Sequence, residues 1–409
     1  MSTLSLPRPN QGIWPGLHAT PRSPLRARIA ESLFRNAVRT LPVTIVLPGG
    51  RTLGAGGPIM RLHRPAAFFH RLGADAKIGF GEAYMVGDWS SNELADVLSA
   101  FAARLTTLVP PKLQRLRRWV DRGHPSTDAN DVTGARSNIH RHYDLSNELF
   151  AAFLDETMTY SSAWFDGTND LREAQLRKID GVLDYAGVRA GSNVLEIGTG
   201  WGALAIRAAQ RGATVTSLTI SAEQKKLAEQ RIAQAGVADR VTVALRDYRE
   251  ETGSYDAVVS VEMIEAVGRE YWPAYFSMLD RVLVPGGRIG LQAITMPHDR
   301  MLASADSYTW IHKYIFPGGL IPSVKAIEQT LAAHTSLKIT SWREFGHDYA
   351  ETLRRWRETF VHRWDEIRSL GFDDTFRRMW EFYLAYSEAG FRVGYLGVRQ
   401  FAIDQRLGR

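Results

Sequence analysis

The chain has 409 residues, of which 44% are hydrophobic and 23% charged, with a formal net charge of +6 and no cysteine. This length and apolar content predict two globular units rather than a disordered chain. The absence of cysteine excludes disulfides, thiolate catalysis and cysteine-type zinc sites, and no metal site is predicted. The basic balance favours an anionic partner, either nucleic acid or a membrane surface. No apolar run is long enough to span a bilayer or to form a signal core, so we expect a soluble or peripheral protein.

The first part of the chain predicts a small α+β domain. Residues 1–23 contain four prolines and are expected to form a flexible arm. Apolar spacing and turn residues then predict a helix, a β-hairpin and two further helices, at residues 24–39, 43–53, 66–72 and 94–108. The last two helices flank GFGEAYMVGDW (residues 79–89), which is rich in glycine and aromatic residues. We therefore assign residues 24–109 to an N-terminal domain.

A basic segment separates this domain from the rest of the chain. Residues 110–136 begin with a run in which basic side chains alternate with Leu113, Leu116, Trp119 and Val120. Two interpretations stay open: a solvated linker helix, or an amphipathic segment that lies on an anionic bilayer. The polar tract that follows, at residues 123–134, places the domain boundary there.

From residue 137 to residue 409 the pattern predicts one continuous α/β domain. Predicted strands lie at residues 193–197, 213–219, 240–245, 255–261 and 288–294. Predicted helices lie at residues 170–186, 202–211, 221–235 and 270–283, the last ended by Pro285-Gly-Gly. This alternation predicts a doubly wound, Rossmann-like parallel sheet. Residues 301–321 and 341–371 are interpreted as insertions and a lid, before a helix at 373–389 and a strand at 394–403.

The most informative stretch is NVLEIGTGWG (residues 193–202), a short apolar strand followed by three glycines and a helix start. Glycine permits positive φ and removes the Cβ atoms that would block a close ligand. A glycine loop between a strand and a helix places ligand groups against bare backbone. The spacing Glu-x-Gly-x-Gly differs from the Gly-x-Gly-x-x-Gly of dinucleotide sites and favours the methionine and ribose of S-adenosylmethionine.

Polar residues follow the next two strands. No acidic residue ends the second strand, and Thr219, Ser221 and Gln224 are the candidate substitutes for binding ribose. Ser221 and Gln224 also have the spacing of a helix capping box, which needs no ligand. After the third strand, Asp247 and Tyr248 are candidates for the adenine contact. Because these positions follow successive parallel strands, they predict one crevice.

Four motifs now make a family resemblance specific: SNIHRHYDLSNELF (137–150), TYSSAWF (159–165), EIGTGWG (196–202) and IFPGG (315–319). They resemble the cyclopropane fatty acid synthase family, which includes the mycolic acid methyltransferases, over residues 137–409. Residues 79–89 are similar to the extra, lipid-associated domain of the phospholipid-acting members. The resemblance implies a class I methyltransferase fold and methyl transfer from S-adenosylmethionine to a cis double bond of an unsaturated phospholipid acyl chain.

The resemblance also implies where the protein acts and with what. It implies a carbocation intermediate and a cytoplasmic enzyme peripheral to the anionic inner face of the plasma membrane, with no nucleic acid partner. A homodimer and a separate reductase are left open. Aromatic faces can stabilise a cation, and the candidates are Tyr143, Tyr160, Trp164, Phe165, Tyr308, Trp310, Tyr314 and Phe316; packing in the core is the alternative for each. The predicted cofactor site comprises Tyr143, Tyr160, Ser161, Gly198, Gly200, Gly202, Thr219, Ser221, Gln224, Asp247 and Tyr248.

In families of this kind a bound bicarbonate is the base, held by a glutamate, a histidine, a tyrosine and backbone amides. The resemblance places the glutamate at Glu265, the tyrosine at Tyr349 and a backbone donor at Ile294. Two positions depart from the pattern: Ser162 stands where cysteine is usual, and Gln292 stands where histidine is usual. Glu262, three residues before Glu265, competes with it for the role of buried carboxylate.

Gln292 matters most for the product, because an amide can bind an anion but cannot carry its proton. One hypothesis is therefore that the carbocation undergoes a hydride shift and loses a proton from a chain carbon. The product would be a methylene- or methyl-branched (10-methyl-type) chain, whereas unchanged deprotonation would give a cyclopropane. Three other functions are weighed: a catalytically inactive lipid-binding paralogue, a nicotinamide-dependent oxidoreductase, and a nucleic-acid methyltransferase. The loop spacing and the absence of a base-holding Asn/Asp-Pro-Pro-Tyr/Phe motif argue against the last two.

Overall fold

The computed structural model describes residues 9–104 and 146–406, and the predicted basic segment at 110–136 lies outside this range, as does Tyr143. The chain divides into two compact units that both draw on separate parts of the sequence. Unit 1 comprises Met1–Gly123, Ser307–Ile315 and Leu353–Tyr395, and unit 2 comprises His124–Asp306, Phe316–Thr352 and Leu396–Arg409. The sequence predicts one boundary near residue 123, whereas unit 1 also takes up the two later segments.

Unit 2 is built around a seven-stranded sheet in its described part, with the order β10-β11-β9-β8-β5-β6-β7. Five strands are parallel: β5 (Asn193–Ile197), β6 (Thr214–Thr219), β7 (Val241–Leu245), β8 (Tyr255–Val261) and β9 (Leu283–Thr295). At one edge, β11 (Gly397–Gln405) pairs antiparallel with β9, and β10 (Leu337–Glu344) pairs antiparallel with β11. This arrangement confirms the predicted doubly wound, class I methyltransferase-like fold.

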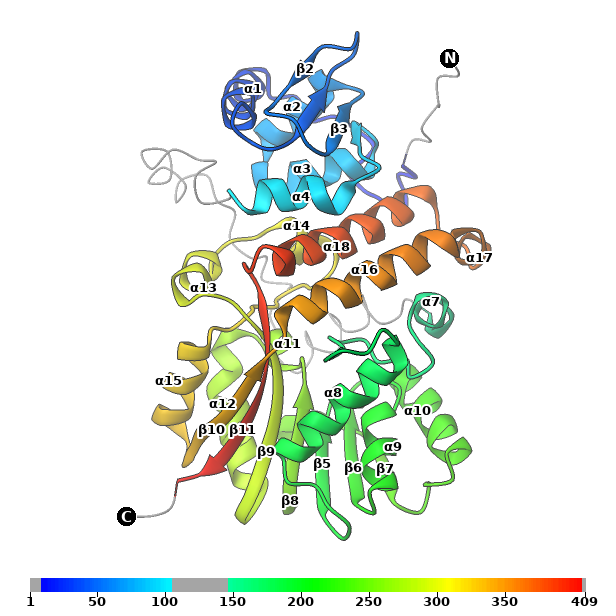
Figure 1. Ribbon diagram of the computed structural model, residues 1–409, viewed down its shortest axis with the longest axis vertical. Helices are drawn as coiled ribbons and strands as arrows, with labels where there is room; N and C mark the ends of the chain where they lie inside the picture. The colour runs from blue at the N-terminus through cyan, green and yellow to red at the C-terminus, as the bar shows by residue number, and fades with distance from the viewer. Residues whose placement is uncertain (1–8, 105–145, 407–409) are drawn as a thin grey trace. The chain divides into compact units, whose positions relative to one another are not determined.

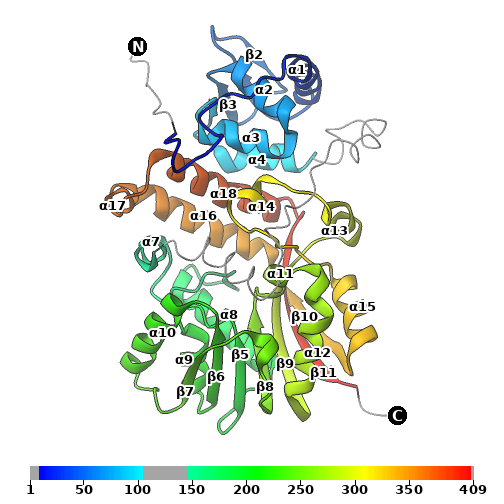
Figure 2. The same ribbon diagram turned by 180° about the vertical axis from the view of Figure 1, so that it is seen from behind.

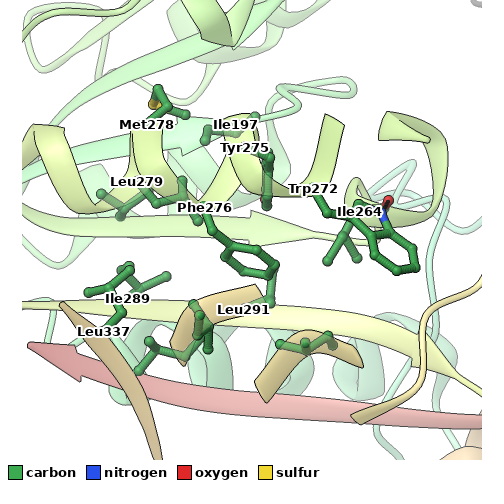
Figure 3. Close-up of a cluster of buried hydrophobic side chains, with 14 of the residues drawn as sticks. Ile197, Ile264, Trp272, Tyr275, Phe276, Met278, Leu279, Ile289, Leu291 and Leu337 are labelled. Carbon is green, nitrogen blue, oxygen red and sulfur yellow. Dashed lines mark hydrogen bonds between the residues drawn. The ribbon is translucent and has the colours of Figure 1, made fainter. Parts of the chain in front are cut away.

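Helices cover both faces of this sheet, as the two opposite views show (Figure 1, Figure 2). Residues of α8 (Leu171–Tyr185) and α9 (Ala203–Gln210) pack on one face against Val194, Val215 and Ala257. Residues of α12 (Trp272–Val282) and α15 (Val324–His334) pack on the other face against β5, β8 and β9. Figure 3 shows this second core, in which Tyr275, Phe276 and Leu279 of α12 lie over Ile289 and Leu291 of β9. Further helices are α7 (Asn147–Phe153), α10 (Ala222–Gln234), α11 (Ile264–Val267) and α13 (His298–Ser304).

Most predicted elements of unit 2 are confirmed to within a few residues, and two predictions are wrong. The helix predicted at residues 270–283 ends at Val282, and Pro285-Gly-Gly lies inside β9 instead of ending the helix. The predicted insertion at 341–371 begins inside β10, and α16 (Gly346–His362) follows that strand. Strand β10 lies at the sheet edge, where Lys338, Thr340 and Trp342 are exposed. Its sequence therefore shows only a weak alternation of apolar and polar residues, and the strand is hard to predict.

Unit 1 contains a four-stranded sheet in its described part, with the order β2-β1-β3-β4. The strands are β1 (Thr44–Val46), β2 (Thr52–Leu53), β3 (Ile59–Leu62) and β4 (Trp89–Ser90), and the predicted hairpin is confirmed by β1 and β2. The helices are α1 (Pro24–Val38), α2 (Pro65–Ala74), α3 (Ala76–Met85), α4 (Leu94–Ala102), α14 (Trp310–Tyr314), α17 (Trp364–Ser369) and α18 (Asp374–Arg392). Helix α18 packs against α3 and α4, although nearly 300 residues separate them in sequence.

The core of unit 1 is aromatic and contains the buried ion pair of Arg71 and Asp88. Trp89 and Phe382 lie in an edge-to-face arrangement at a centroid distance of 6.3 Å. Arg71 Nε lies 3.1 Å from Asp88 Oδ2, and both side chains are almost fully buried. Arg71 also donates to the carbonyl of Leu17, which is 2% exposed, so the part of the predicted flexible arm around Leu17 is packed into unit 1. No described helix is long and apolar enough to cross a membrane.

Candidate active site

The glycine loop between β5 and α9 adopts the backbone that the sequence predicts. Gly198, Gly200 and Gly202 all have positive φ, at 92°, 52° and 88°. A Cβ atom added to Gly198 would lie 2.8 Å from Met263 Cγ, which is too close, whereas one added to Gly200 meets no described atom within 4 Å. The loop is therefore tightly packed on one side and open above Gly200, which fits a ligand held against bare backbone.

Glu196, the acidic residue of the motif, is buried beneath this loop with 2% exposure. Its carboxylate accepts a hydrogen bond from Ser217 Oγ, at 2.5 Å, on the neighbouring strand. Burial raises the pKa of Glu196 to about 8, and the Ser217 hydrogen bond only partly opposes this. Glu196 therefore holds a proton in the folded protein at a pH where it is ionised in the unfolded chain.

This proton predicts a pH-dependent stability. Because the pKa of Glu196 rises from 4.5 in the unfolded chain to about 8, its contribution to stability is complete below pH 4.5 and is lost as the pH rises to 8. Between pH 4.5 and 8, the wild-type free energy of unfolding should therefore fall by roughly 1.4 kcal/mol per pH unit through Glu196. We expect this fall to be absent in Glu196→Gln, because its side chain does not titrate. Thermal unfolding of both proteins between pH 5 and 8 tests this. Parallel curves of Tm against pH would contradict it.

The candidate ribose-binding residues form their own hydrogen-bond network after β6. Ser221 Oγ accepts the amide proton of Gln224, and the Ser221 amide donates to Thr219 Oγ1. Thr219 Oγ1 in turn donates to Gln224 Oε1, at 3.1 Å. Ser221 is therefore the N-cap of α10, and the side chains of Thr219 and Gln224 are held together at the strand end.

After β7, Asp247 is buried at 2% exposure and is paired with its own neighbour. Its Oδ1 accepts from the amide and Nε of Arg249, both at 2.9 Å, and its Oδ2 accepts from Nη2 of the same residue, at 2.7 Å. An adenine amino group would have to share these oxygens with Arg249. Tyr248 begins the short 3₁₀ turn beside it and packs edge-to-face against Tyr275.

The aromatic candidates are distributed over both units. Tyr160 packs edge-to-face against Phe150 at 5.1 Å, and Trp164 lies under the guanidinium of Arg343 at 4.3 Å, in unit 2. Phe165 is buried and Phe316 is 37% exposed in the same unit. Trp310 and Tyr314 belong to unit 1, where Trp310 is buried against Phe382, and Tyr308 also belongs to that unit.

Two carboxylates meet where β8 and β9 end. Glu262 directly follows β8, and its Oε1 accepts from the Ser162 amide and from Gln292 Nε2, both at 2.9 Å. The Tyr349 side chain is also hydrogen-bonded to Glu262. Glu265 lies on α11, and its Oε1 accepts from the Ile294 amide at 2.5 Å. Glu265 Oε2 is buried and has no hydrogen-bond partner among the described residues.

A lysine and a second glutamine complete this cluster. Lys178 of α8 is fully buried, and its Nζ donates to Ser161 Oγ at 2.5 Å. Gln400 of β11 donates from Nε2 to Gln292 Oε1, at 3.0 Å, and to the Lys178 carbonyl, at 2.8 Å. With its oxygen occupied by Gln400, the Gln292 amide has its NH₂ group directed at Glu262, and the whole network fixes this orientation.

The charges in this cluster shift one another's titration. Burial lowers the pKa of Lys178 to about 8, against the opposing charges of Glu262 and Asp155. Burial, and then the charge of Glu262, raises the pKa of Glu265 to about 8. Burial also raises the pKa of Glu262, but the Lys178 charge and three hydrogen bonds oppose that rise. Of the two carboxylates, Glu262 is therefore the one that its neighbours stabilise in the charged form, and Glu265 keeps its proton at neutral pH.

The sequence predicts much of this cluster but not its centre. The structure brings together Ser162, Gln292, Ile294, Tyr349 and Glu265, as the resemblance implies. It places Glu262, the competitor, at the convergence of these donors. Lys178 and Gln400 were missed. A signal for Lys178 exists, because it lies four residues from both Ala174 and Val182 on the buried stripe of α8.

Comparison with known proteins shows the family to which the chain belongs. The family model of mycolic acid cyclopropane synthetase matches residues 130–401. The chain is 52% identical over 404 residues to the tuberculostearic acid methyltransferase UfaA1 of Mycobacterium tuberculosis, covering 95% of each chain. It is 34% identical over 339 residues to the cyclopropane-fatty-acyl-phospholipid synthase of Escherichia coli, covering 80% of this chain and 82% of the relative.

A solved structure extends the comparison to three dimensions. The mycolic acid cyclopropane synthase CmaA1, complexed with SAH and CTAB, has a TM-score of 0.60 and 30% identity to this chain. The superposition covers 66% of this chain and 98% of CmaA1. The matches in sequence, the parallel sheet and the glycine loop all lead to the same family. The chain therefore belongs to the mycolic acid cyclopropane synthetase family of S-adenosylmethionine-dependent methyltransferases.

Proposed function

We propose that this enzyme methylates the cis double bond of an unsaturated phospholipid acyl chain and forms a branched chain rather than a cyclopropane. S-adenosylmethionine supplies an electrophilic methyl group when bound. The residues that would hold it are the bare loop at Gly198–Gly202, the hydroxyls of Thr219 and Ser221, and Asp247. The name of the relative at 52% identity, a tuberculostearic acid methyltransferase, supports the same substrate class.

The proposed reaction has three steps: methyl transfer, hydride shift and loss of a proton. The alkene π electrons form a new C–C bond to the methyl group as the S–CH₃ bond breaks, which leaves a carbocation on the neighbouring chain carbon. A hydride shift moves the cation to the methyl-bearing carbon. Loss of one proton from the transferred methyl group then gives a methylene-branched chain, with the C–H electron pair forming the new C=C bond. Reduction to the saturated methyl-branched form would need a separate reductase.

The observation that carries this proposal is the state of Gln292. The amide is fully buried, its oxygen accepts from Gln400 and its nitrogen donates to Glu262. It has no basic site that could accept a proton, unlike the histidine that is usual at this position. The deprotonation machinery therefore differs from that of a cyclopropane-forming enzyme, while the cofactor loop is retained.

Product analysis tests the proposal. Purified enzyme is incubated with S-adenosylmethionine and vesicles of an oleoyl phospholipid, and the released fatty acids are examined by mass spectrometry and NMR. We expect a fatty acid heavier by one CH₂ with the signals of an exocyclic methylene. Ring-proton signals of a cyclopropane would overturn the branched product. No methyl incorporation would favour an inactive lipid-binding paralogue.

The remaining expectations about partners belong to the same proposal. Attachment to an anionic membrane surface is supported by the net charge of +6 and by the substrate class. Vesicles with and without anionic lipid, used in the same assay, separate surface attraction from acyl-chain recognition. A homodimer and a partner reductase stay predictions from the sequence.

A further inference from the structure

The Glu262 carboxylate has hydrogen bonds to three residues that lie far apart in the sequence. The Ser162 amide and Gln292 Nε2 both donate to Oε1 at 2.9 Å, and the Tyr349 side chain is bonded to the same carboxylate. Ser162 and Gln292 are fully buried, whereas Glu262 itself is only partly buried. The carboxylate is thus held in place by buried neighbours from three separate parts of the chain.

The backbone of Glu262 is also unusual. Its φ of 52° lies in the left-handed region, which costs free energy for a residue with a Cβ atom. The amide of Glu262 donates to the Gln292 carbonyl at 2.8 Å, so this conformation is fixed by the adjacent strand. A glycine would adopt the same backbone without strain. The chain has a glutamate there, which indicates that the side chain is needed.

Charged and titratable groups approach Glu262 from several elements. Lys178 of α8 is the cation that stabilises its negative charge, and Asp155 lies near enough to Lys178 to share that charge. Glu265 of α11 is the competing acid, and Tyr349 of α16 is a hydrogen-bond donor. Glu262 has three donors and the nearby cation, whereas the hydrogen bonds to Glu265 come from the backbone amides of Ile294 and of Glu265 itself. Of the two carboxylates, Glu262 is therefore the one better stabilised in its ionised form.

The donors around Glu262 are those that the family resemblance assigns to bicarbonate. Ser162, Gln292 and Tyr349 are directed at the Glu262 carboxylate, and the Ile294 amide at that of Glu265. We propose that the Glu262 carboxylate is the catalytic base, taking the place of bicarbonate and accepting the proton that the carbocation loses. This inference rests on the proposed function. One C–H bond breaks, its electron pair forms the new C=C bond, and the proton passes to Glu262.

Removal of the carboxylate tests the proposal through chemical rescue. We expect Glu262→Gln to lower kcat on the order of 100- to 10,000-fold, the range of a lost general base. Glu262→Gly should lose as much activity, and its backbone is unstrained at this φ, so it is expected to fold. Added bicarbonate or formate should restore the glycine variant at least about tenfold, whereas wild-type turnover should not change when bicarbonate is removed or added.

Two controls show whether Glu262 acts as a catalytic base or only supports the structure. Glu270→Gln makes the same change at an exposed position of the following turn and should keep wild-type turnover. Calorimetric binding of S-adenosylhomocysteine checks that each variant is folded. A Glu262→Gln protein that binds this ligand normally and turns over within about threefold of wild type overturns the proposal, as does a wild-type enzyme that requires bicarbonate. If wild type itself forms no methylated lipid, the proposed function fails instead.

Discussion

A Lys178→Met protein is expected to turn over at least about 100-fold more slowly than wild type at pH 7. Lys178 is the buried cation that keeps Glu262 ionised, and without it burial raises the pKa of Glu262 further. The acid limb of the kcat profile should therefore move to higher pH, and part of the activity should return as the pH rises. The wild-type profile should fall above pH 8, where Lys178 loses its proton, and this limb should be absent in the variant.

The matched control is Lys338→Met, which removes an exposed lysine from edge strand β10 of the same unit. We expect it to keep the wild-type profile of kcat against pH. Initial rates of methyl incorporation from pH 5.5 to 9.5 give the comparison. If Lys178→Met retains both limbs of the wild-type profile, Lys178 does not control the ionisation of Glu262.

The second large effect is expected at the cofactor loop, where Gly198→Ala should weaken S-adenosylhomocysteine binding at least tenfold, or about 1.4 kcal/mol. The φ of Gly198 is 92°, and its added methyl would lie 2.8 Å from Met263. Relief of this contact must move either Met263 or the loop, and both lie beside the proposed ligand. We also expect a loss of about 1–2 kcal/mol in the free energy of unfolding from the left-handed backbone.

Gly191→Ala separates these two effects. Gly191 has a φ of 81°, precedes β5, and would place its Cβ in open space among the described atoms. It should lose a similar amount of stability and keep its affinity for S-adenosylhomocysteine. Isothermal calorimetry and denaturant unfolding measure the two quantities. Equal loss of affinity in both variants would show that the effect is not local to the loop.

The sequence predicts the parallel part of the fold well because buried parallel strands are continuous apolar runs. Val194, Leu195 and Ile197 in β5 are all buried, and β8 shows the same pattern. The sequence does not predict edge strand β10, because most of its side chains are exposed and it has no continuous apolar run. The membership of α18 in unit 1 was also not predictable, since its partners α3 and α4 lie far away in sequence.

For the active site, the sequence predicts which residues take part but not how they are paired. Motif positions lead to Glu265, Tyr349 and Gln292. The convergence of donors on Glu262 depends on the left-handed backbone after β8, which no local motif encodes. Lys178 and Gln400 come from α8 and β11, far from each other in sequence, and the tertiary fold brings them together: Gln400 Nε2 donates to the Lys178 carbonyl and to Gln292 Oε1.

The interleaved course of the chain limits how this protein can be dissected. Helix α18 buries Phe382, Trp380 and Tyr383 within unit 1, although it follows the methyltransferase sheet strands β5–β10 in sequence. A fragment that begins after residue 136 would keep this helix but lose α3 and α4. The apolar face of α18 would then be exposed to water, which favours aggregation. Physiological and biophysical work on the catalytic half is therefore best done with the intact polypeptide.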